Sequence, residues 1–69
     1  MHALPLTENR FFGAIRTSDE GEWLDVRTIS FTREGVDEIA RHNDARITHW
    51  AKANPVVRVV RFRIEEVVE

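Results

Sequence analysis

A chain of 69 residues with 42% apolar and 32% charged residues has the composition of one small soluble globular domain, and its length leaves no room for a second. The absence of cysteine excludes disulfides and thiolate metal sites, and no apolar run approaches the roughly 20 residues of a membrane helix. We therefore expect a single cytoplasmic domain over residues 1–69, with residues 1–9 as a flexible start.

The net charge of −2 hides an uneven distribution of charge along the chain. Residues 1–40 contain eight acidic and four basic residues, whereas residues 41–63 contain six basic residues and one acidic residue. The end of the chain is again acidic. Such blocks can attract a charged partner, or they can neutralise each other across adjacent elements of one domain.

The first predicted elements are two strands joined by an acidic turn. Residues 10–17 are largely apolar and suit a sheet, and Ser18-Asp19-Glu20-Gly21 is typical of a turn. Residues 22–31 again mix aromatic, β-branched and polar residues. We predict a β-hairpin with an exposed acidic tip.

A helix is predicted to begin near Arg33, where Thr32 offers a hydroxyl as N-cap and acidic residues follow in the first turns. Apolar residues then recur at helical spacing. The helix either continues to Ala53 or breaks near residues 42–44 and is followed by a second helical turn. In both cases the following Asn-Pro pair ends the helical region.

The clearest strand signal is residues 56–64, which are dominated by β-branched residues and contain no glycine or proline. Their alternation places Val60, Phe62 and Ile64 on one face, which we predict to be the core face. The other face, predicted to meet solvent or a partner, carries Val59, Arg61, Arg63 and Glu65. The element order predicts an α+β fold of two layers, strand-strand-helix-strand, with a three-stranded antiparallel sheet in the order 2-1-3 and one helix on one face.

The predicted core draws on every element: Phe11 or Phe12, Ile15, Ile29, Phe31, Val36, Ile39, Ala40, Ile47, Trp50, Val60, Phe62 and Ile64. One helix covers only one face of the sheet, so the other face would carry an unusual amount of apolar surface. The residues expected there are Val57 and Val59, with Leu24 and either Val26 or Phe12. A homodimer or a partner protein would bury that face; alternatively, the valines are strand formers tolerated at a surface.

No group of residues suggests catalysis or metal binding. His42 and His49 are seven residues apart, whereas zinc-binding histidines on one helix are normally three to five apart. Adjacent carboxylates such as Glu65 and Glu66 lie at the chain end, and neither a nucleophile motif nor a glycine-rich phosphate loop is present. We therefore expect no enzyme activity, no cofactor and no metal site.

The arginines of the last strand suggest a nucleic-acid interface. A sheet face that combines arginines with exposed aromatic rings can neutralise phosphates and stack bases. The arginines that would form it are Arg16, Arg58, Arg61 and Arg63. Alternatively, these arginines form cross-strand ion pairs with acidic residues, namely Glu22, Asp25 or Glu65.

The two tryptophans differ as interaction candidates. Trp50 could anchor a partner, but closing the end of a small core is the commoner fate of such a residue. Trp23, beside the acidic turn, is the better candidate if its side chain is exposed. Together with the last strand, the candidate interaction surface is Arg16, Trp23, Val57, Arg58, Val59, Arg61 and Arg63.

Three stretches resemble small proteins of unassigned function that bacteriophages and prophages encode: Trp23-Leu24-Asp25-Val26, Phe31-Thr32-Arg33-Glu34 and residues 49–58. The resemblance extends over most of residues 11–68. It implies an accessory protein that acts by binding host or phage macromolecules, and it assigns no role to any single residue.

The leading hypothesis is therefore a small phage-type accessory protein that acts as a stoichiometric protein-interaction module. Its partner would be a host or phage protein bound through the uncovered sheet face or the basic block of residues 41–63, and a homodimer is one form it could take. No membrane partner is expected. The alternative is a nucleic-acid-binding module that uses the arginines of the sheet face.

Overall fold

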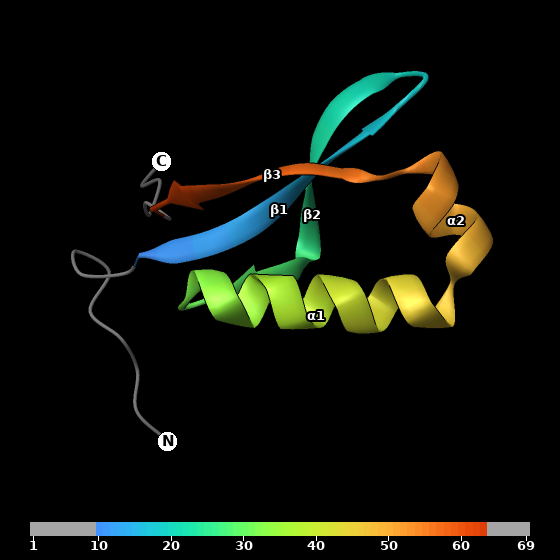
Figure 1. Cartoon of the computed structure of the whole chain (residues 1–69). Coiled ribbons are helices and arrows are strands. Elements are labelled where there is room, and N and C mark those ends of the chain that lie inside the picture. The colour runs from blue at the N-terminus through green and yellow to red at the C-terminus, as the bar shows by residue number, and fades with distance from the viewer. Residues whose placement is uncertain (1–9, 64–69) are drawn as a thin grey trace, which may run out of the picture.

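The computed structural model describes residues 10–63, which form three strands and two helices (Figure 1). In chain order these are β1 (Phe11–Ser18), β2 (Gly21–Ser30), α1 (Arg33–Arg46), α2 (Thr48–Ala53) and β3 (Val56–Phe62). The strands form one antiparallel sheet in the order β2-β1-β3. The predicted α+β fold, with an open three-stranded sheet in the order 2-1-3, is thereby confirmed.

Some sequence-based expectations concern other parts of the chain. The flexible start predicted for residues 1–9, and Ile64 and Glu65 at the end of the last predicted strand, lie outside the described residues. Between residues 10 and 63, neither helix has the length and apolar character that crossing a membrane requires.

A tight turn closes the hairpin between β1 and β2. Ser18 pairs with Gly21, so only Asp19 and Glu20 form the loop, and both are exposed. Gly21 has a φ of 117°, a conformation that residues with a Cβ rarely adopt. Glycine therefore suits this position, and the predicted acidic tip of the hairpin is confirmed.

β2 is irregular in its second half, where a side chain replaces part of the strand ladder. Ala14 of β1 pairs with Asp25. Two residues earlier Phe12 pairs with Ser30, so β2 carries extra residues between the two pairs. The hydroxyl of Thr28 fills this gap by accepting a hydrogen bond from the N–H of Ala14 (2.8 Å) and donating one to the carbonyl of Asp25 (2.6 Å). Because Thr28 is fully buried, these bonds satisfy backbone groups that water cannot reach.

The helical region consists of two helices. Thr32 caps α1, its Oγ1 accepting a hydrogen bond from the N–H of Gly35 at 2.9 Å, as the sequence predicts. Ile47 leaves the helical conformation, with φ −129° and ψ 66°, and separates α1 from α2. Of the two alternatives, the structure shows the broken helix, with the break a few residues later than residues 42–44.

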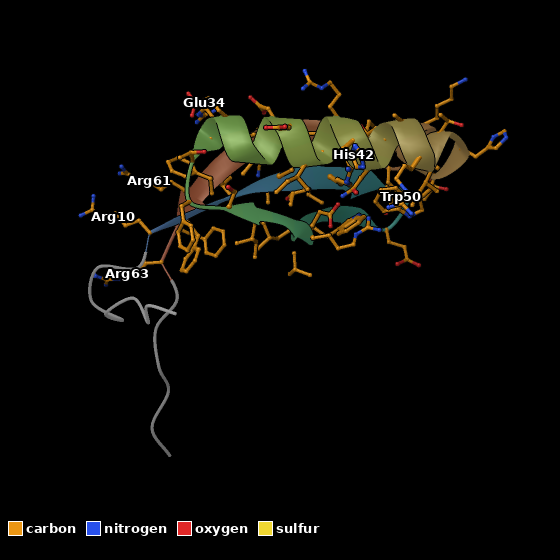
Figure 2. The ribbon with its side chains drawn as sticks, turned by 90° about the horizontal axis from the view of Figure 1, so that it is seen from below. Arg10, Glu34, His42, Trp50, Arg61 and Arg63 are labelled. Carbon is orange, nitrogen blue, oxygen red and sulfur yellow. The ribbon has the colours of Figure 1, made fainter. Side chains whose placement is uncertain are left out.

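Both helices lie on one side of the sheet, seen nearly edge-on in Figure 2. Arg16 points from β1 towards them and bonds to Asp44 of α1. Residues at alternate positions point the other way, to a face that no described element covers. We call it the open face; its apolar residues are Phe11, Gly13, Ile15, Leu24, Ile29, Val60 and Phe62, with Phe31 beside them.

The predicted orientation of β3 is wrong. Val59 pairs with Ala14 and lies on the helix side, whereas Val60 pairs with Gly13 and lies on the open face. Phe62 lies on the open face as well. Both faces of this strand carry valine, so alternation alone does not say which face meets the helices. The register with β1 decides it.

The buried core is smaller and more polar than predicted. In the described range, the buried apolar side chains are those of Ala14, Val36 and Ala40. Phe31 is 60% exposed and Ile47 44%, so placing them in the core was wrong. Phe31 lies just beyond β2 and Ile47 at the helix break, where the packing ends. The other predicted core residues described are half-buried: Phe11, Phe12, Ile15, Ile29, Ile39, Trp50, Val60 and Phe62.

Candidate functional site

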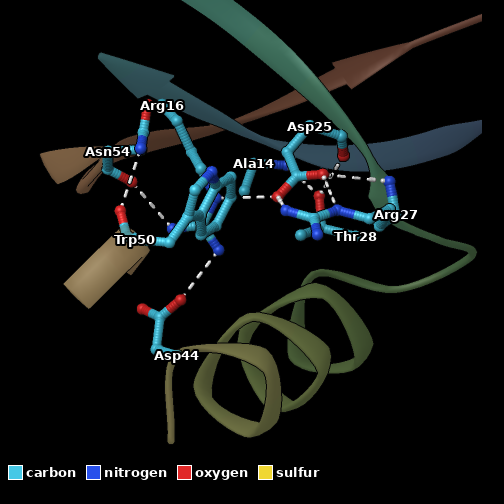
Figure 3. Close-up of polar contacts among 8 residues, drawn as sticks. All are labelled: Ala14, Arg16, Asp25, Arg27, Thr28, Asp44, Trp50 and Asn54. Atoms are coloured by element: carbon cyan, nitrogen blue, oxygen red, sulfur yellow. Dashed lines mark hydrogen bonds and ion pairs between the residues drawn. The ribbon is translucent and has the colours of Figure 1, made fainter. Parts of the chain in front are cut away.

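The side chain of Arg16 is fully buried between the sheet and the helices. Its Nε donates to Oδ2 of Asp25 at 2.7 Å. Nη2 donates to Oδ1 of Asp44 at 2.8 Å, and Nη1 donates to the backbone carbonyl of Asn54 at 2.9 Å (Figure 3). The partners belong to β2, to α1 and to the residue after α2, so one side chain joins the sheet to both helices.

Two guanidinium groups lie over the ring of Trp50. The Cζ of Arg16 is 4.6 Å and that of Arg27 is 4.3 Å from the centroid of the ring. Trp23 adds an edge-on contact, with ring centroids 5.9 Å apart and an interplanar angle of 68°. A cation over the face of an indole ring is attracted to its π-electrons. Trp50, held by these contacts, closes the helix side of the core. Of the two roles considered for Trp50 from the sequence, a partner anchor or a residue that closes the core, the structure shows the second.

Asp25 is the acidic centre of this group and is almost completely buried. Its Oδ1 accepts hydrogen bonds from the backbone N–H and the Nε of Arg27, both at 3.1 Å. Burial by itself raises the pKa of Asp25, but the hydrogen bonds from Arg27 and Arg16 outweigh it and leave the pKa below its ordinary value. Asp25 is therefore ionised at neutral pH.

These contacts stabilise the fold and do not suggest catalysis. We call the group the buried arginine cluster; it consists of Arg16, Asp25, Arg27, Asp44 and Trp50. Both carboxylate oxygens of Asp25 are engaged by arginines, and a carboxylate with a lowered pKa is a poor general base near neutral pH. Across residues 10–63, no three histidine or acidic side chains are grouped so that they could hold a metal ion.

The open face gathers apolar side chains from all three strands. The ring of Phe11 lies 5.3 Å from that of Phe31 and 5.9 Å from that of Phe62, measured between centroids. Towards the hairpin turn, Arg58 and Glu22 form an ion pair of 2.7 Å across β1, with both side chains about half exposed. The face thus has an aromatic end and a polar end.

The residues proposed from the sequence do not share one surface. Arg16 is buried and so cannot belong to an interaction surface. Trp23 is half-buried against Trp50, and Val59 is half-buried on the helix side. Four of the seven are exposed: Val57, Arg58, Arg61 and Arg63. The alternative of cross-strand ion pairs is confirmed for Arg16 with Asp25 and for Arg58 with Glu22.

Sequence reasoning missed the aromatic end of the open face, since Phe31, Phe62 and either Phe11 or Phe12 were assigned to the core. It also missed the central role of Asp25. A single acidic residue within the apolar run Trp23-Leu24-Asp25-Val26, on a strand expected beside an arginine, was the available signal. Comparisons with protein-family models, with curated proteins and with solved structures found no match for the chain.

Proposed function

We propose that this chain is a small accessory protein, of the phage type that the sequence resembles, and that it acts by binding another protein in stoichiometric amounts through the open face. The observation that supports the proposal is the aromatic and aliphatic surface of the open face, which no described element covers. A second copy of the chain is one possible occupant and would give a homodimer.

The energetics of a thin core favour this use of the open face. A domain of about 60 residues buries only about 60% of its unfolded surface, so its margin of stability is small. Phe31 remains 60% exposed, and covering apolar surface stabilises the folded state. Aromatic anchors surrounded by polar residues are also typical of binding hot spots. The Arg58–Glu22 pair provides such a polar margin.

Binding of nucleic acid receives less support. Arg58 lies on the open face, whereas Arg61 pairs with Phe12 and lies on the helix side. Arg16 is buried, and Arg58 is already paired with Glu22. The described residues therefore form no face on which several arginines alternate with exposed rings, the pattern that single-strand binding requires.

The test is affinity capture with the tagged chain from lysate of the cells in which it occurs, with and without nuclease. Phe31→Glu places a charge on the open face at a side chain that is already exposed, so the fold should tolerate it. Ile47→Glu is the matched control, since it changes an exposed apolar residue at the helix break, off the sheet.

We expect the wild-type chain and Ile47→Glu to retain the same protein after nuclease treatment, and Phe31→Glu to lose it. Retention of that protein by Phe31→Glu would exclude the open face as the binding surface. Retention that disappears with nuclease in all three chains would instead support the nucleic-acid alternative.

A further inference from the structure

The outer edge of β3 is a second surface without a partner, and it is distinct from the open face. In the order β2-β1-β3, β3 pairs with β1 on one side only, and within residues 10–63 no strand lies on its other side (Figure 1). The register with β1 shifts only next to Arg16, so β3 is regular from Arg58 to Phe62. An edge strand of this kind presents unpaired N–H and C=O groups that can pair with another strand.

The side chains along this edge are basic on both faces of the sheet. Arg58 lies on the open face and Arg61 on the helix side, and both are exposed. Arg61 makes no ion pair or hydrogen bond within the described part of the chain. A strand added beside β3 would therefore meet an unbalanced positive charge, Arg61, on the helix side. On the open face it would meet Arg58, whose charge Glu22 already balances.

A shallow hollow of about 290 Å³ lies where β3 ends beside the start of β1, and it is lined by Arg10, Arg61, Phe62 and Arg63. Figure 2 shows the three arginines at the same end of the molecule. Like Arg61, Arg10 has no ion pair with any described residue. Guanidinium groups bind carboxylates through paired, charge-assisted hydrogen bonds, so the hollow suits an acidic side chain.

A second copy of β3 is a poor occupant of this edge. Antiparallel pairing centred on Val59 sets Arg58 diagonally from Arg58 of the other copy. Centred on Val60, the pairing brings Arg61 of each copy together diagonally. Diagonal neighbours on adjacent strands are about 7–8 Å apart, within reach of long side chains such as arginine, so like charges disfavour both registers.

We propose that the outer edge of β3 binds an extended acidic segment of a partner protein, which adds a fourth strand to the sheet. Backbone hydrogen bonds would supply the pairing, as in other cases of β-strand addition. An acidic side chain on the helix-side face of the added strand would meet Arg61, and the hollow next to Arg61 would receive a further carboxylate. A second acidic side chain three residues away would lie on the opposite face, where it would share Arg58 with Glu22.

The probe is the peptide acetyl-TVETVETV-amide, with two glutamates three residues apart. One comparison peptide carries lysine in place of glutamate, and a second carries N-methyl groups at alternate positions, which block strand pairing. Binding to the full chain is measured by calorimetry and by amide chemical-shift changes. The full chain also carries Glu65, Glu66 and Glu69. Measuring with the full chain therefore lets these acidic residues compete with the peptide for the arginines.

We expect the acidic peptide to bind at least about tenfold more tightly than the lysine peptide, since like charges across an interface disfavour binding. Shift changes should concentrate in β3, and the N-methylated peptide should not bind. Arg61→Glu should weaken binding of the acidic peptide about tenfold or more. Arg41→Glu, the same charge change at an exposed position on α1, should alter it less than about twofold.

Binding of the lysine or N-methylated peptide as tight as that of the acidic peptide would overturn the proposal. So would the absence of binding, because the arginines would then act only to keep the edge from pairing. Phe31→Glu should leave peptide binding unchanged. If Phe31→Glu abolishes it and the shifts map to the open face, the peptide is bound by the surface proposed above and the β3 edge is excluded.

Discussion

At the scale of single residues, the buried Arg16 guanidinium depends on its partners, because a charge removed from water must be paired and hydrogen-bonded. Asp25 is its most buried partner. We expect Asp25→Ala to lower the free energy of unfolding by about 3–5 kcal/mol, since it breaks the buried ion pair and leaves the Nε of Arg16 without an acceptor, with only the partly exposed Asp44 to balance the charge. Urea denaturation followed by circular dichroism measures this loss.

Glu22 offers a matched control, because its ion pair with Arg58 has the same 2.7 Å distance but is half exposed. Solvent screens such a pair, so Glu22→Ala should cost less than about 1 kcal/mol. If the two substitutions lower the free energy of unfolding equally, burial does not make the Arg16–Asp25 ion pair more stabilising than the exposed pair.

The lowered pKa of Asp25 makes part of the stability dependent on pH. The stabilising contribution of Asp25 is fully present above the ordinary pKa of an aspartate and is lost as pH falls through the lower pKa of the folded state. We expect the free energy of unfolding of the wild-type chain to fall below about pH 5. In Asp25→Asn this part of the pH dependence should be absent, as urea denaturation at several pH values would show. A variant that keeps the wild-type slope below pH 5 would contradict the assignment.

The residue-level structure was predictable only in part. Thr32 as N-cap and Val36 and Ala40 as core residues follow from local patterns, and the structure confirms them. Arg16 was placed on a surface because arginine is rarely buried unless paired. Asp25, nine positions away, was considered as a cross-strand partner. Asp44 lies 28 positions away on α1, a contact that local patterns do not reveal.

At the scale of elements, the hydroxyl of Thr28 links the irregular half of β2 to β1, where the backbone pairing is interrupted. Thr28→Val removes the acceptor for the N–H of Ala14 and the donor to the carbonyl of Asp25. We expect a loss of about 1–3 kcal/mol in the free energy of unfolding, because the N–H of Ala14 is left buried without a partner. Hydrogen exchange should also become faster at that amide.

Thr17→Val is the control for this substitution, because Thr17 is a half-buried strand residue whose hydroxyl makes no hydrogen bond within residues 10–63. It should change the free energy of unfolding by less than about 0.5 kcal/mol. Equal effects of the two substitutions would mean that Thr28 acts through its shape and not through its hydroxyl.

The types and order of the elements were predictable from periodicity and turn residues, but two features that shape the site were not. The face of β3 that meets the helices depends on its register with β1, since valines occupy both faces. The helix break lies at Ile47, an apolar residue without turn preference, and not at the polar residues 42–44. On the two sides of this break, Asp44 of α1 and the carbonyl of Asn54 after α2 both bond to Arg16. Such tertiary contacts are not included in local propensity.

For the molecule as a whole, the order β2-β1-β3 follows from a tight hairpin and a helical return that places β3 beside β1. That topology puts both helices on one side and leaves the other side open. An uncovered apolar face was predictable from the number of elements alone. Its residues were not, because the sequence reasoning placed the phenylalanines inside.

If the open face binds protein, two copies of the chain should pack through it at high concentration when no other partner is present. Two sheets stacked in this way would bury the rings of Phe11, Phe31 and Phe62 between them. The neutral Arg58–Glu22 pair adds no net charge to oppose the contact. We expect the mass from sedimentation equilibrium to rise from monomer towards dimer with concentration, and added salt not to reverse it, because the contact is apolar. Phe31→Glu should stay monomeric while Ile47→Glu behaves as wild type. A monomeric wild-type chain at millimolar concentration would remove the homodimer and leave the open face to a partner of different sequence.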